Sequence, residues 1–426
     1  MGASSTNIEP ADTRRALWRN RDYNLLWGGQ AVSSIGTQAS TLAFPLLLLA
    51  LTHSPAQAGL ASALRALPYV VFSLPAGALV DRWDRKRVML VCDALRAIAL
   101  ASIPVALALG RLGAPQIYAV SLIEGSLYVF FNVAEAASLP RIVSTEQIPA
   151  ATAQNQATEA ISSLVGPPIG GLLFGLGRAL PFLADAVSYA GSVCSLLFMR
   201  ATFQEEHTAA RRRLIEEIAE GMRWLWGHSL IRYMAFLTGV SNFVSSGAFL
   251  IVIVIAQQVQ HATPFAIGLI FTIGGVGGIV GSIIAVSLQR RFSFGQIIIT
   301  CTWIWALTTP LFIIAPNPLF LGLIFTATFI TSPIYNVVQF GYRLTIIPDA
   351  LQGRVNSAFR LIAFGGQPLG YALAGALLQA VGPITAIALF SLPYVVMAVL
   401  TTANRHVREA RPRASHAPSG TASSTE

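Results

Sequence analysis

The 426 residues are 54% hydrophobic and only 11% charged, and the formal net charge is +9. A soluble domain carries about 25% charged residues, so this composition excludes an ordinary water-soluble protein and predicts that most of the chain faces lipid. The basic residues are dispersed over short loops, which fits orientation in a membrane and argues against binding of nucleic acid.

Apolar runs of about 20 residues, the length that crosses a bilayer as a helix, recur along the chain. A polar interruption at 200–232 divides them six and six. The sequence therefore predicts an all-α integral membrane protein with twelve transmembrane helices in two six-helix halves. In chain order the predicted helices lie near 26–51, 57–80, 88–110, 116–138, 158–177, 180–199, 233–256, 265–288, 296–314, 318–340, 357–380 and 384–402.

These runs divide the chain into five parts. Within the polar interruption, apolar residues recur at helical spacing among charged ones over 213–226, which predicts an amphipathic helix lying on the membrane face. The tail is rich in Pro, Ser and Ala and is predicted to be disordered. The parts are an N-terminal segment 1–23, a first six-helix bundle 24–199, a linker 200–232, a second bundle 233–402 and a tail 403–426.

The basic residues are divided unequally between the two sides of the predicted bundle. Of the 28 Lys and Arg residues, Arg111 and Arg178 fall in outer loops, Arg65 and Arg96 fall within spans, and the remaining 24 fall in inner segments. Because positive charge is retained on the inner side, both termini are expected in the cytoplasm of a bacterial plasma (inner) membrane.

The loop between the second and third runs carries a recognisable pattern: residues 77–87 read GALVDRWDRKR. It resembles the signature G-x-x-x-D-R-x-G-R-R of the major facilitator superfamily, although Asp84 stands where that signature has Gly. The resemblance implies a gate that holds the two halves together on the cytoplasmic side. Glu135, at the inner end of the fourth run, is expected to pair with Arg85 or Arg87. The expected gate residues are Gly77, Asp81, Arg82, Arg85, Arg87 and Glu135.

The fifth run begins its Gly-rich part with GPPIGG at residues 166–171. This resembles the G-P-x-x-G-G motif of the drug-and-proton antiporters in the same superfamily, which implies export. Small residues let two membrane helices approach closely. The eighth run offers a matching set of glycines, so the fifth and eighth spans are expected to pack across the interface between halves. The residues concerned are Gly166, Pro167, Gly170 and Gly171, and Gly274, Gly277, Gly278 and Gly281.

The fifth and eleventh runs resemble each other. Residues 166–175 (GPPIGGLLFG) and 366–375 (GQPLGYALAG) share five identities at an offset of 200. This favours a duplication of one six-helix half, an arrangement in which transporters bind substrate between the halves.

Further stretches are similar to the superfamily's subgroup of siderophore (enterobactin-type) and macrolide exporters, and the resemblance runs from 20 to 402. It implies the major facilitator fold and an efflux function without naming the cargo. The stretches include residues 21–23, Asp93, Arg96, Asp185, 220–223 and 348–355.

Ionisable residues at membrane depth cost about 2.5–3.5 kcal/mol each on insertion, so each needs a partner or a function. Glu124 lies well inside the fourth run, and Arg65 lies at a comparable depth in the second, so an ion pair between them is expected. Asp93 and Arg96, three residues apart, are expected to neutralise each other. We hypothesise that Glu124, with Arg65, couples transport to protons; the alternative is that Glu124 is a structural ion-pair partner of Arg65. An arginine typical of antiporters is missing from the fourth run, where Ser121 stands.

Polar residues at helical spacing give the first, fourth, seventh and tenth runs one polar face each. In the superfamily these four helices line the central cavity, so the faces are expected to do so here. They comprise Gln30, Ser34 and Gln38, then Tyr128 and Asn132, then Asn242 and Ser246, and finally Tyr335, Asn336 and Gln339.

Together these features predict a secondary active transporter that exports a small amphipathic molecule (a drug, an antibiotic or a siderophore) by proton antiport with alternating access. We expect a monomer whose partners are its small-molecule substrate, protons and the lipid bilayer, with no cofactor, no metal and no nucleic acid. An importer of a sugar or peptide is the alternative within the same fold. An enzyme is disfavoured because the six His residues lie in loops or tails, without H-E-x-x-H or a phosphate-binding loop. A membrane receptor without transport activity has no supporting feature.

Overall fold

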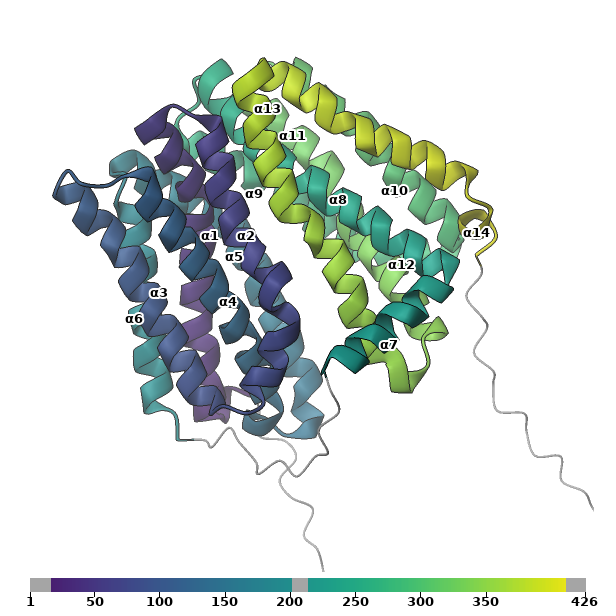
Figure 1. Ribbon diagram of the computed structural model, residues 1–426, viewed down its shortest axis with the longest axis horizontal. Helices are drawn as coiled ribbons and strands as arrows, with labels where there is room; N and C mark the ends of the chain where they lie inside the picture. Colours follow the sequence, from purple (N-terminus) through teal and green to yellow (C-terminus); the bar gives the residue numbers. More distant parts are fainter. Residues whose placement is uncertain (1–16, 201–213, 411–426) are drawn as a thin grey trace, which may run out of the picture.

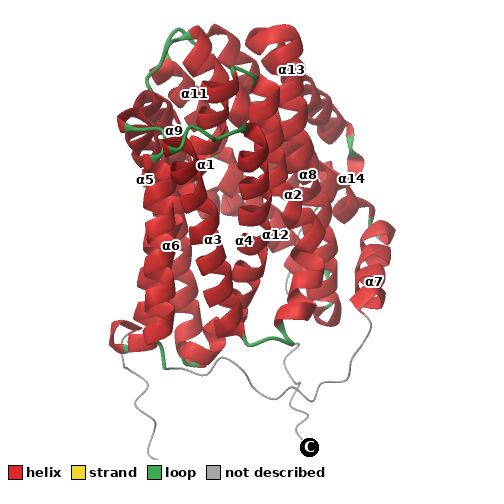
Figure 2. Ribbon diagram, turned by 60° about the vertical axis from the view of Figure 1, so that its left-hand side comes forward, coloured by secondary structure: helices red, strands yellow, loops and turns green. Residues whose placement is uncertain are grey.

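The computed structural model describes residues 17–200 and 214–410, and its elements are helices joined by short loops (Figures 1 and 2). The predictions for 1–16, 201–213 and 411–426 lie outside the described residues. The helices are α1 (Arg21–Thr52), α2 (Pro55–Val80), α3 (Arg85–Ala108), α4 (Ala114–Ile142), α5 (Ile148–Leu176), α6 (Leu180–Phe198), α7 (Leu214–Gly227), α8 (Ser229–Val254), α9 (Pro264–Arg291), α10 (Phe294–Thr308), α11 (Pro318–Phe329), α12 (Thr331–Ile346), α13 (Gln352–Ala403) and α14 (Arg405–Arg408). Short 3-10 turns stand at Leu17–Arg19, Thr145–Gln147, Thr309–Ile314 and Asp349–Leu351, and a π-helical turn at Ile255–Val259.

Among the described residues, 11 helical stretches are long and apolar enough to cross a membrane. The last of these contains two spans, because α13 is 52 residues long, about 78 Å at 1.5 Å per residue, and breaks at Gly382. Gly382 has φ +77°, and Pro383 follows it, so the chain turns back there. The predicted all-α fold with two sets of six spans is confirmed.

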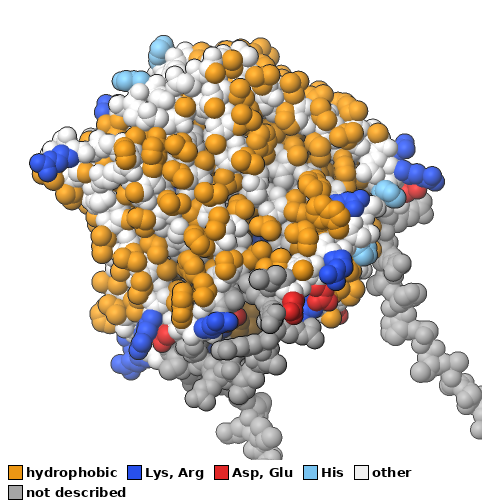
Figure 3. Space-filling view, viewed as in Figure 1, with side chains coloured by type: hydrophobic (Ala, Val, Ile, Leu, Met, Phe, Trp, Pro, Cys, Tyr) orange, Lys and Arg blue, Asp and Glu red, His pale blue; other side chains and the backbone are white. Residues whose placement is uncertain are grey.

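The two halves stand side by side, the first in purple to teal and the second in green to yellow in Figure 1. We call the end of the bundle where α1 begins, α6 ends and α7 lies the linker end, and the other the opposite end. Hydrophobic side chains cover the visible flank in Figure 3, and most of its Lys and Arg side chains lie near the rim. That surface is what a helix bundle facing lipid requires.

Three segments differ from their predicted form, and one of them is the start of the tail that was predicted to be disordered: Arg405–Arg408 forms α14, and Val407 is fully buried. The fifth helix begins at Ile148 rather than near 158, because the polar residues of its first turns face a cavity and not lipid. The linker helix α7 packs against α13. Glu220 of α7 and Arg354 of α13 form an ion pair at 2.6 Å, and Gly221 lies against the Arg354 backbone. The linker helix α7 therefore lies against the second half of the protein.

The repeat in the sequence corresponds to repeated packing. In the first half Gly170 of α5 faces α1, where an added Cβ would lie 2.8 Å from the Cα atom of Ala39. In the second half Gly370 of α13 faces α8, where an added Cβ would lie 3.0 Å from the carbonyl carbon of Phe243. The fifth and eleventh spans thus pack on the first and seventh through equivalent glycines.

The halves touch mainly through two helix pairs, α2 with α13 and α5 with α9. At the first pair, a Cβ on Gly59 would lie 2.8 Å from the Cα atom of Gly375. At the second, a Cβ on Gly171 would lie 2.8 Å from the carbonyl carbon of Pro264, the first residue of α9. All four residues lie near the opposite end, so the halves are in contact there.

Candidate transport cavity and buried charge network

A cavity of about 840 Å³ lies between the halves. Its walls come from α1, α2, α3, α4 and α5 of the first half and from α8 and α13 of the second. It extends from residues at the linker end, such as Pro140 and Ile148, inward to Phe44, Phe249 and Tyr371. Beyond these, fully buried apolar residues of α1 and α8 close the opposite end. The conformation is therefore one in which the cavity reaches the linker end.

Glu124 of α4 lies at the centre of a buried ionic network on the inner wall of this cavity. One carboxylate oxygen accepts from Nε of Arg65 on α2 at 2.5 Å, and the other accepts from Nη2 of Arg96 on α3 at 2.6 Å. Arg65 also donates to the hydroxyl of Thr41 on α1 at 2.5 Å. The predicted Arg65–Glu124 pair is present, and Arg96 is a second partner that the sequence did not indicate.

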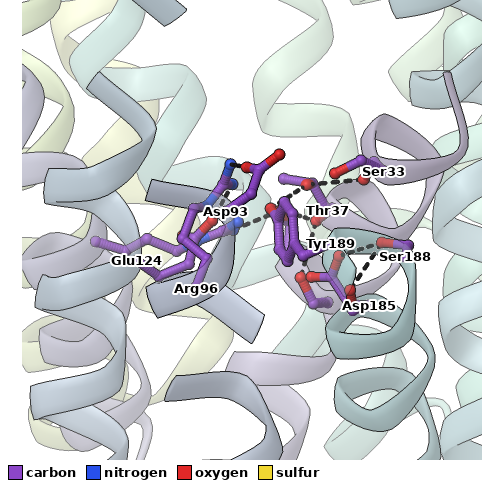
Figure 4. A network of polar contacts seen from close by, with 11 residues as sticks. Ser33, Thr37, Asp93, Arg96, Glu124, Asp185, Ser188 and Tyr189 are labelled. Carbon is purple, nitrogen blue, oxygen red and sulfur yellow. Dashed lines mark hydrogen bonds and ion pairs between the residues drawn. The ribbon is translucent and has the colours of Figure 1, made fainter. Parts of the chain in front are cut away.

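Arg96 connects this pair to α6 (Figure 4). Its guanidinium lies over the ring of Tyr189, 4.0 Å from the centroid, and its Nη1 stands 3.7 Å from Asp93. Asp93 accepts a hydrogen bond from Ser192 of α6 at 2.6 Å, and Ser192 accepts one from Gln30 of α1 at 3.0 Å. The predicted pairing of Asp93 with Arg96 is present, but the shorter contact of Arg96 is with Glu124.

Asp185 of α6 is fully buried beside Tyr189, against α1 (Figure 4). Ser188 donates to its Oδ1 at 3.3 Å, and its Oδ2 has no hydrogen-bond partner among the described residues. A Cβ on Gly36 of α1 would lie 2.6 Å from Oδ1. Sequence reasoning identified this residue only through the family resemblance and assigned it no role.

Comparison with known proteins identifies the family to which the chain belongs. A family model described as transmembrane secretion effector matches residues 13–370. The chain belongs to this family. It is thereby a transporter of the major facilitator superfamily, as the sequence predicted, and not an enzyme.

Curated relatives cover most of the chain. The multidrug efflux pump Tap of Mycolicibacterium fortuitum is 26% identical over 88% of this chain and 93% of its own length. Tap of Mycobacterium tuberculosis (strain H37Rv) is 28% identical over 85% of this chain and 88% of its own. The enterobactin exporter EntS of Citrobacter koseri is 25% identical over 84% of this chain and 86% of its own.

Solved structures share the fold at low identity. The nucleoside transporter NupG superposes with a TM-score of 0.71 at 14% identity, over 92% of this chain and 100% of its own. A bacterial homolog of the human lysosomal transporter Spinster gives a TM-score of 0.71 at 12% identity, over 91% and 96%. These likenesses establish the major facilitator architecture.

The major facilitator signature loop is tied to its own half. Arg85 donates to the Ala137 carbonyl at 2.7 Å and to Asp81 at 3.3 Å, and Lys86 donates to the Met199 carbonyl at 2.6 Å. Asp84 caps α3 by accepting from the Arg87 backbone at 3.0 Å, in an ordinary extended conformation that does not require the family's glycine. These contacts of the loop stay within the first half, as an open linker end requires. Gly77 has open space around it, and Arg82 is exposed.

The expected pairing of Glu135 with Arg85 or Arg87 is wrong. Arg85 binds Ala137 and Asp81, and Arg87 lies 3.9 Å from Asp84, whereas Glu135 lines the cavity. The reason is helical phase: Glu135 shares the face of α4 that carries Glu124 and Tyr128, which is turned toward the cavity.

The antiporter-like motif does pack the fifth span against the eighth: the expected Gly171 lies against the start of α9, but on the eighth span the contact is made by Gly268 and not by the glycines expected there. A Cβ on Gly268 of α9 would lie 2.7 Å from the Cα atom of Pro168, and Thr272 donates to the Leu164 carbonyl at 2.9 Å. Gly274, Gly277 and Gly281 instead face Phe325, Thr326 and Ile330 of the tenth span, Gly278 faces open space, and Gly166 and Gly170 face α1.

The predicted cavity lining holds for one half only. Gln30, Ser34, Gln38, Tyr128 and Asn132 line the cavity. The five residues predicted from the seventh and tenth spans do not, because neighbouring helices satisfy most of them. On the seventh span, Asn242 donates to the Ala363 carbonyl at 2.7 Å and Ser246 donates to the Gln367 carbonyl at 3.1 Å. On the tenth span, Tyr335 and Gln339 are each hydrogen-bonded to the Thr238 hydroxyl at 2.8 Å. Asn336 lies on the exposed face of α12.

The second half contributes a different set, mainly from the eleventh span. Arg360, Phe364, Gln367 and Tyr371 of α13 line the cavity with Phe249 of α8. Arg360 donates to the Tyr69 hydroxyl of α2 and so bridges the halves. Their spacing of three or four residues is a signal in the sequence, but the eleventh run was interpreted only as the repeat of the fifth.

Proposed function

We propose that this transporter exports a small amphipathic molecule, such as a drug, an antibiotic or a siderophore, across a bacterial inner membrane by proton antiport. The relatives named multidrug efflux pump and enterobactin exporter, each aligned over 84% or more of this chain, support export. We propose further that both termini and the linker end lie in the cytoplasm and that the protein works as a monomer, in line with the distribution of basic residues.

The observation that carries the proposal is the cavity. Its volume of about 840 Å³ falls in the range of about 300–1,000 Å³ that is typical of sites for drug-sized ligands. Aromatic side chains such as Phe44, Phe131, Phe249 and Phe364 alternate on its walls with amides and hydroxyls. Such a surface suits a bulky molecule with one apolar and one polar side.

The position of the opening supports loading from the cytoplasm. With the linker end inside, this conformation presents the cavity to cytoplasmic cargo while the contacts of α2 with α13 and of α5 with α9 close the outer side. Rocking of the halves would open the outer side and release the cargo there, as in other transporters built from repeats.

The buried network is the proposed site of proton coupling. Glu124, Arg65, Arg96, Asp93 and Asp185 all belong to the first half and lie beside or behind the cavity wall. Buried charges in a membrane protein are expensive and mark functional pathways. Because Arg65, Arg96 and Glu124 themselves line the cavity, a change of protonation can alter the wall that the cargo touches.

Transport into inverted membrane vesicles tests the proposal. Vesicles with the chain and matched vesicles without it are given an inside-acid proton gradient and a fluorescent amphipathic dye or a radiolabelled macrolide. We expect gradient-dependent accumulation only with the chain, and its loss in Glu124→Gln. Full activity of Glu124→Gln would reject a role for Glu124. Uptake in the reverse direction, with a sugar or peptide as cargo, would favour the importer alternative.

A further inference from the structure

The fully buried carboxylates of the first half outnumber the guanidinium groups beside them. Asp93, Glu124 and Asp185 have exposed fractions of 0%, 1% and 0%, and Arg65 and Arg96 are the two cations among them. If all five were ionised, the cluster would carry one negative charge in excess. An ionised carboxylate buried without a partner is costly, and such a group neutralises instead.

The geometry identifies which carboxylate lacks a cation. Glu124 has both guanidinium groups within 2.6 Å, and Asp93 has Arg96 at 3.7 Å and the Ser192 hydroxyl at 2.6 Å. No ion pair of Asp185 with a basic side chain occurs among the described residues, and its Oδ2 has no hydrogen-bond partner there. The excess charge therefore belongs to Asp185.

The charged and titratable groups around Asp185 come from each helix packed nearby. Arg96 of α3, Arg65 of α2 and Glu124 of α4 act on it from beyond hydrogen-bond distance, and Tyr189 lies one turn further along α6. On the facing turn of α1, Gly36 and the hydroxyl of Ser40 lie next to the Asp185 carboxylate. A proton on Asp185 would leave two guanidinium groups balanced by two carboxylates.

Asp185 is separated from the cavity by a single helix. Ser33 and Thr37 of α1 line the cavity, and Gly36, on the other side of that helix turn, lies directly against Asp185. Thr37 is also hydrogen-bonded to the Tyr189 hydroxyl at 2.6 Å. The contacts of a cargo molecule with this turn of α1 can thus depend on whether the carboxyl group behind it is protonated.

We propose that Asp185 is the residue that takes up and releases the transported proton, and that Glu124 is a positioning residue that holds Arg65 and Arg96 in place. The proposal rests on the proton antiport proposed above. In each cycle one proton from the outer side binds the Asp185 carboxylate, and the same proton leaves to the cytoplasm. In its ionised form the Asp185 carboxylate attracts Arg96, and this attraction changes the packing of α1 and α6 around the cavity.

The direct test is infrared difference spectroscopy on the purified, reconstituted protein, which does not depend on cargo. A pH titration should show the carbonyl band of one buried protonated carboxyl, and Asp185→Asn should lose it. Asp93→Asn, a buried aspartate with its own partners, should keep the band. A band that persists in Asp185→Asn and disappears in Glu124→Gln would overturn the proposal. Absence of a titrating carboxyl in the unmodified protein would also overturn it.

Transport separates this inference from the proposed function. In proteoliposomes with a fluorescent amphipathic dye, Asp185→Asn should lose proton-driven accumulation about tenfold or more and keep dye exchange between the two sides. Glu124→Gln should lose both, because the arginines lose their anchor. If the unmodified protein accumulates no dye in a proton gradient, proton antiport fails for this dye while the infrared result still decides the role of Asp185. If Asp185→Asn remains fully proton-driven, the inference fails and antiport stands.

Discussion

Glu124 is held by charge-assisted contacts from two helices, α2 and α3. Its two oxygens accept from Arg65 at 2.5 Å and from Arg96 at 2.6 Å, and its exposed fraction is 1%. Charge-assisted bonds of this length are about twice as strong as neutral ones. The same contacts make removal of any partner costly, because a buried cation is then left alone.

Replacement of Glu124 by Gln should therefore destabilise the protein. Two guanidinium groups lose their anion, and breaking a buried pair costs about 3–5 kcal/mol. We expect a lower midpoint of thermal unfolding for the detergent-solubilised protein. The matched control is Glu159→Gln, which removes a carboxylate that is exposed to the cavity, and it should leave the midpoint nearly unchanged. Equal midpoints for the two variants would contradict the role of the network.

At the level of single residues, the sequence predicted part of the site. Depth along the helix was enough to pair Arg65 with Glu124, because both charges had to be neutralised near the same level of the membrane. The local spacing of Asp93 and Arg96 predicted their pairing but concealed the stronger contact of Arg96 with Glu124. That contact depends on the packing of α3 against α4, which periodicity does not contain.

The contact between α5 and α9 shows what single glycines do for whole helices. Gly268 lets α9 approach the backbone of Pro167 and Pro168, and Thr272 adds a hydrogen bond to the Leu164 carbonyl. This surface closes the end of the cavity away from the linker. A side chain placed there must push the two halves apart at that end.

Gly268→Ala is accordingly expected to shift the protein toward the conformation closed at the linker end. A Cβ at this position would lie 2.7 Å from the Cα atom of Pro168, and backbone cannot easily move away. A cysteine replacing Asn155, a cavity residue near the linker end, should react several-fold more slowly with a thiol reagent. The native cysteines are replaced by Ser for this measurement.

Gly278→Ala provides the control for that experiment, since an added Cβ at Gly278 meets nothing within 4 Å. Its cysteine reactivity and transport rate should equal those of the parent. If Gly268→Ala also equals the parent, the α5–α9 contact does not hold the opposite end closed.

Sequence periodicity predicted the positions of the helices in the chain well, but it predicted less well which helices contact one another. Apolar runs and loop charges were sufficient for twelve spans. The polar faces of the seventh and tenth spans were misassigned because a stripe of hydroxyls and amides can be satisfied by a neighbouring helix. Thr238, Tyr335 and Gln339 bind one another in this way, away from the cavity. Distinguishing the two cases requires knowledge of helix rotation, which tertiary packing decides.

The molecule as a whole is asymmetric in charge. The loops and helix ends carry most of the basic residues that give the net charge of +9, whereas the interior of the first half holds an excess of carboxylates. Two arginines counted with the inner segments, Arg343 and Arg360, do not face the inner side: Arg343 is buried against Phe359, and Arg360 lines the cavity. The bias of the remaining loop residues still favours an inner linker end.

Single-cysteine labelling should establish that orientation. Arg82→Cys lies in the exposed loop at the linker end, and Arg111→Cys lies in an exposed loop at the opposite end. A membrane-impermeant maleimide should label Arg111→Cys in intact cells and Arg82→Cys only in inverted vesicles. The reversed pattern would place the linker end outside and would reverse the proposed direction of loading.

The location of the ionic network on consecutive helices has a consequence for biosynthesis. Arg65, Arg96 and Glu124 belong to α2, α3 and α4, which leave the ribosome one after another. An unpaired charge would cost about 2.5–3.5 kcal/mol in the bilayer. Arg96 has Asp93 on its own helix, but Arg65 finds its carboxylate only when α4 arrives, so the nascent chain gains stability in the membrane at that step. The first six helices can therefore insert and assemble as a unit before the ribosome has made the second half.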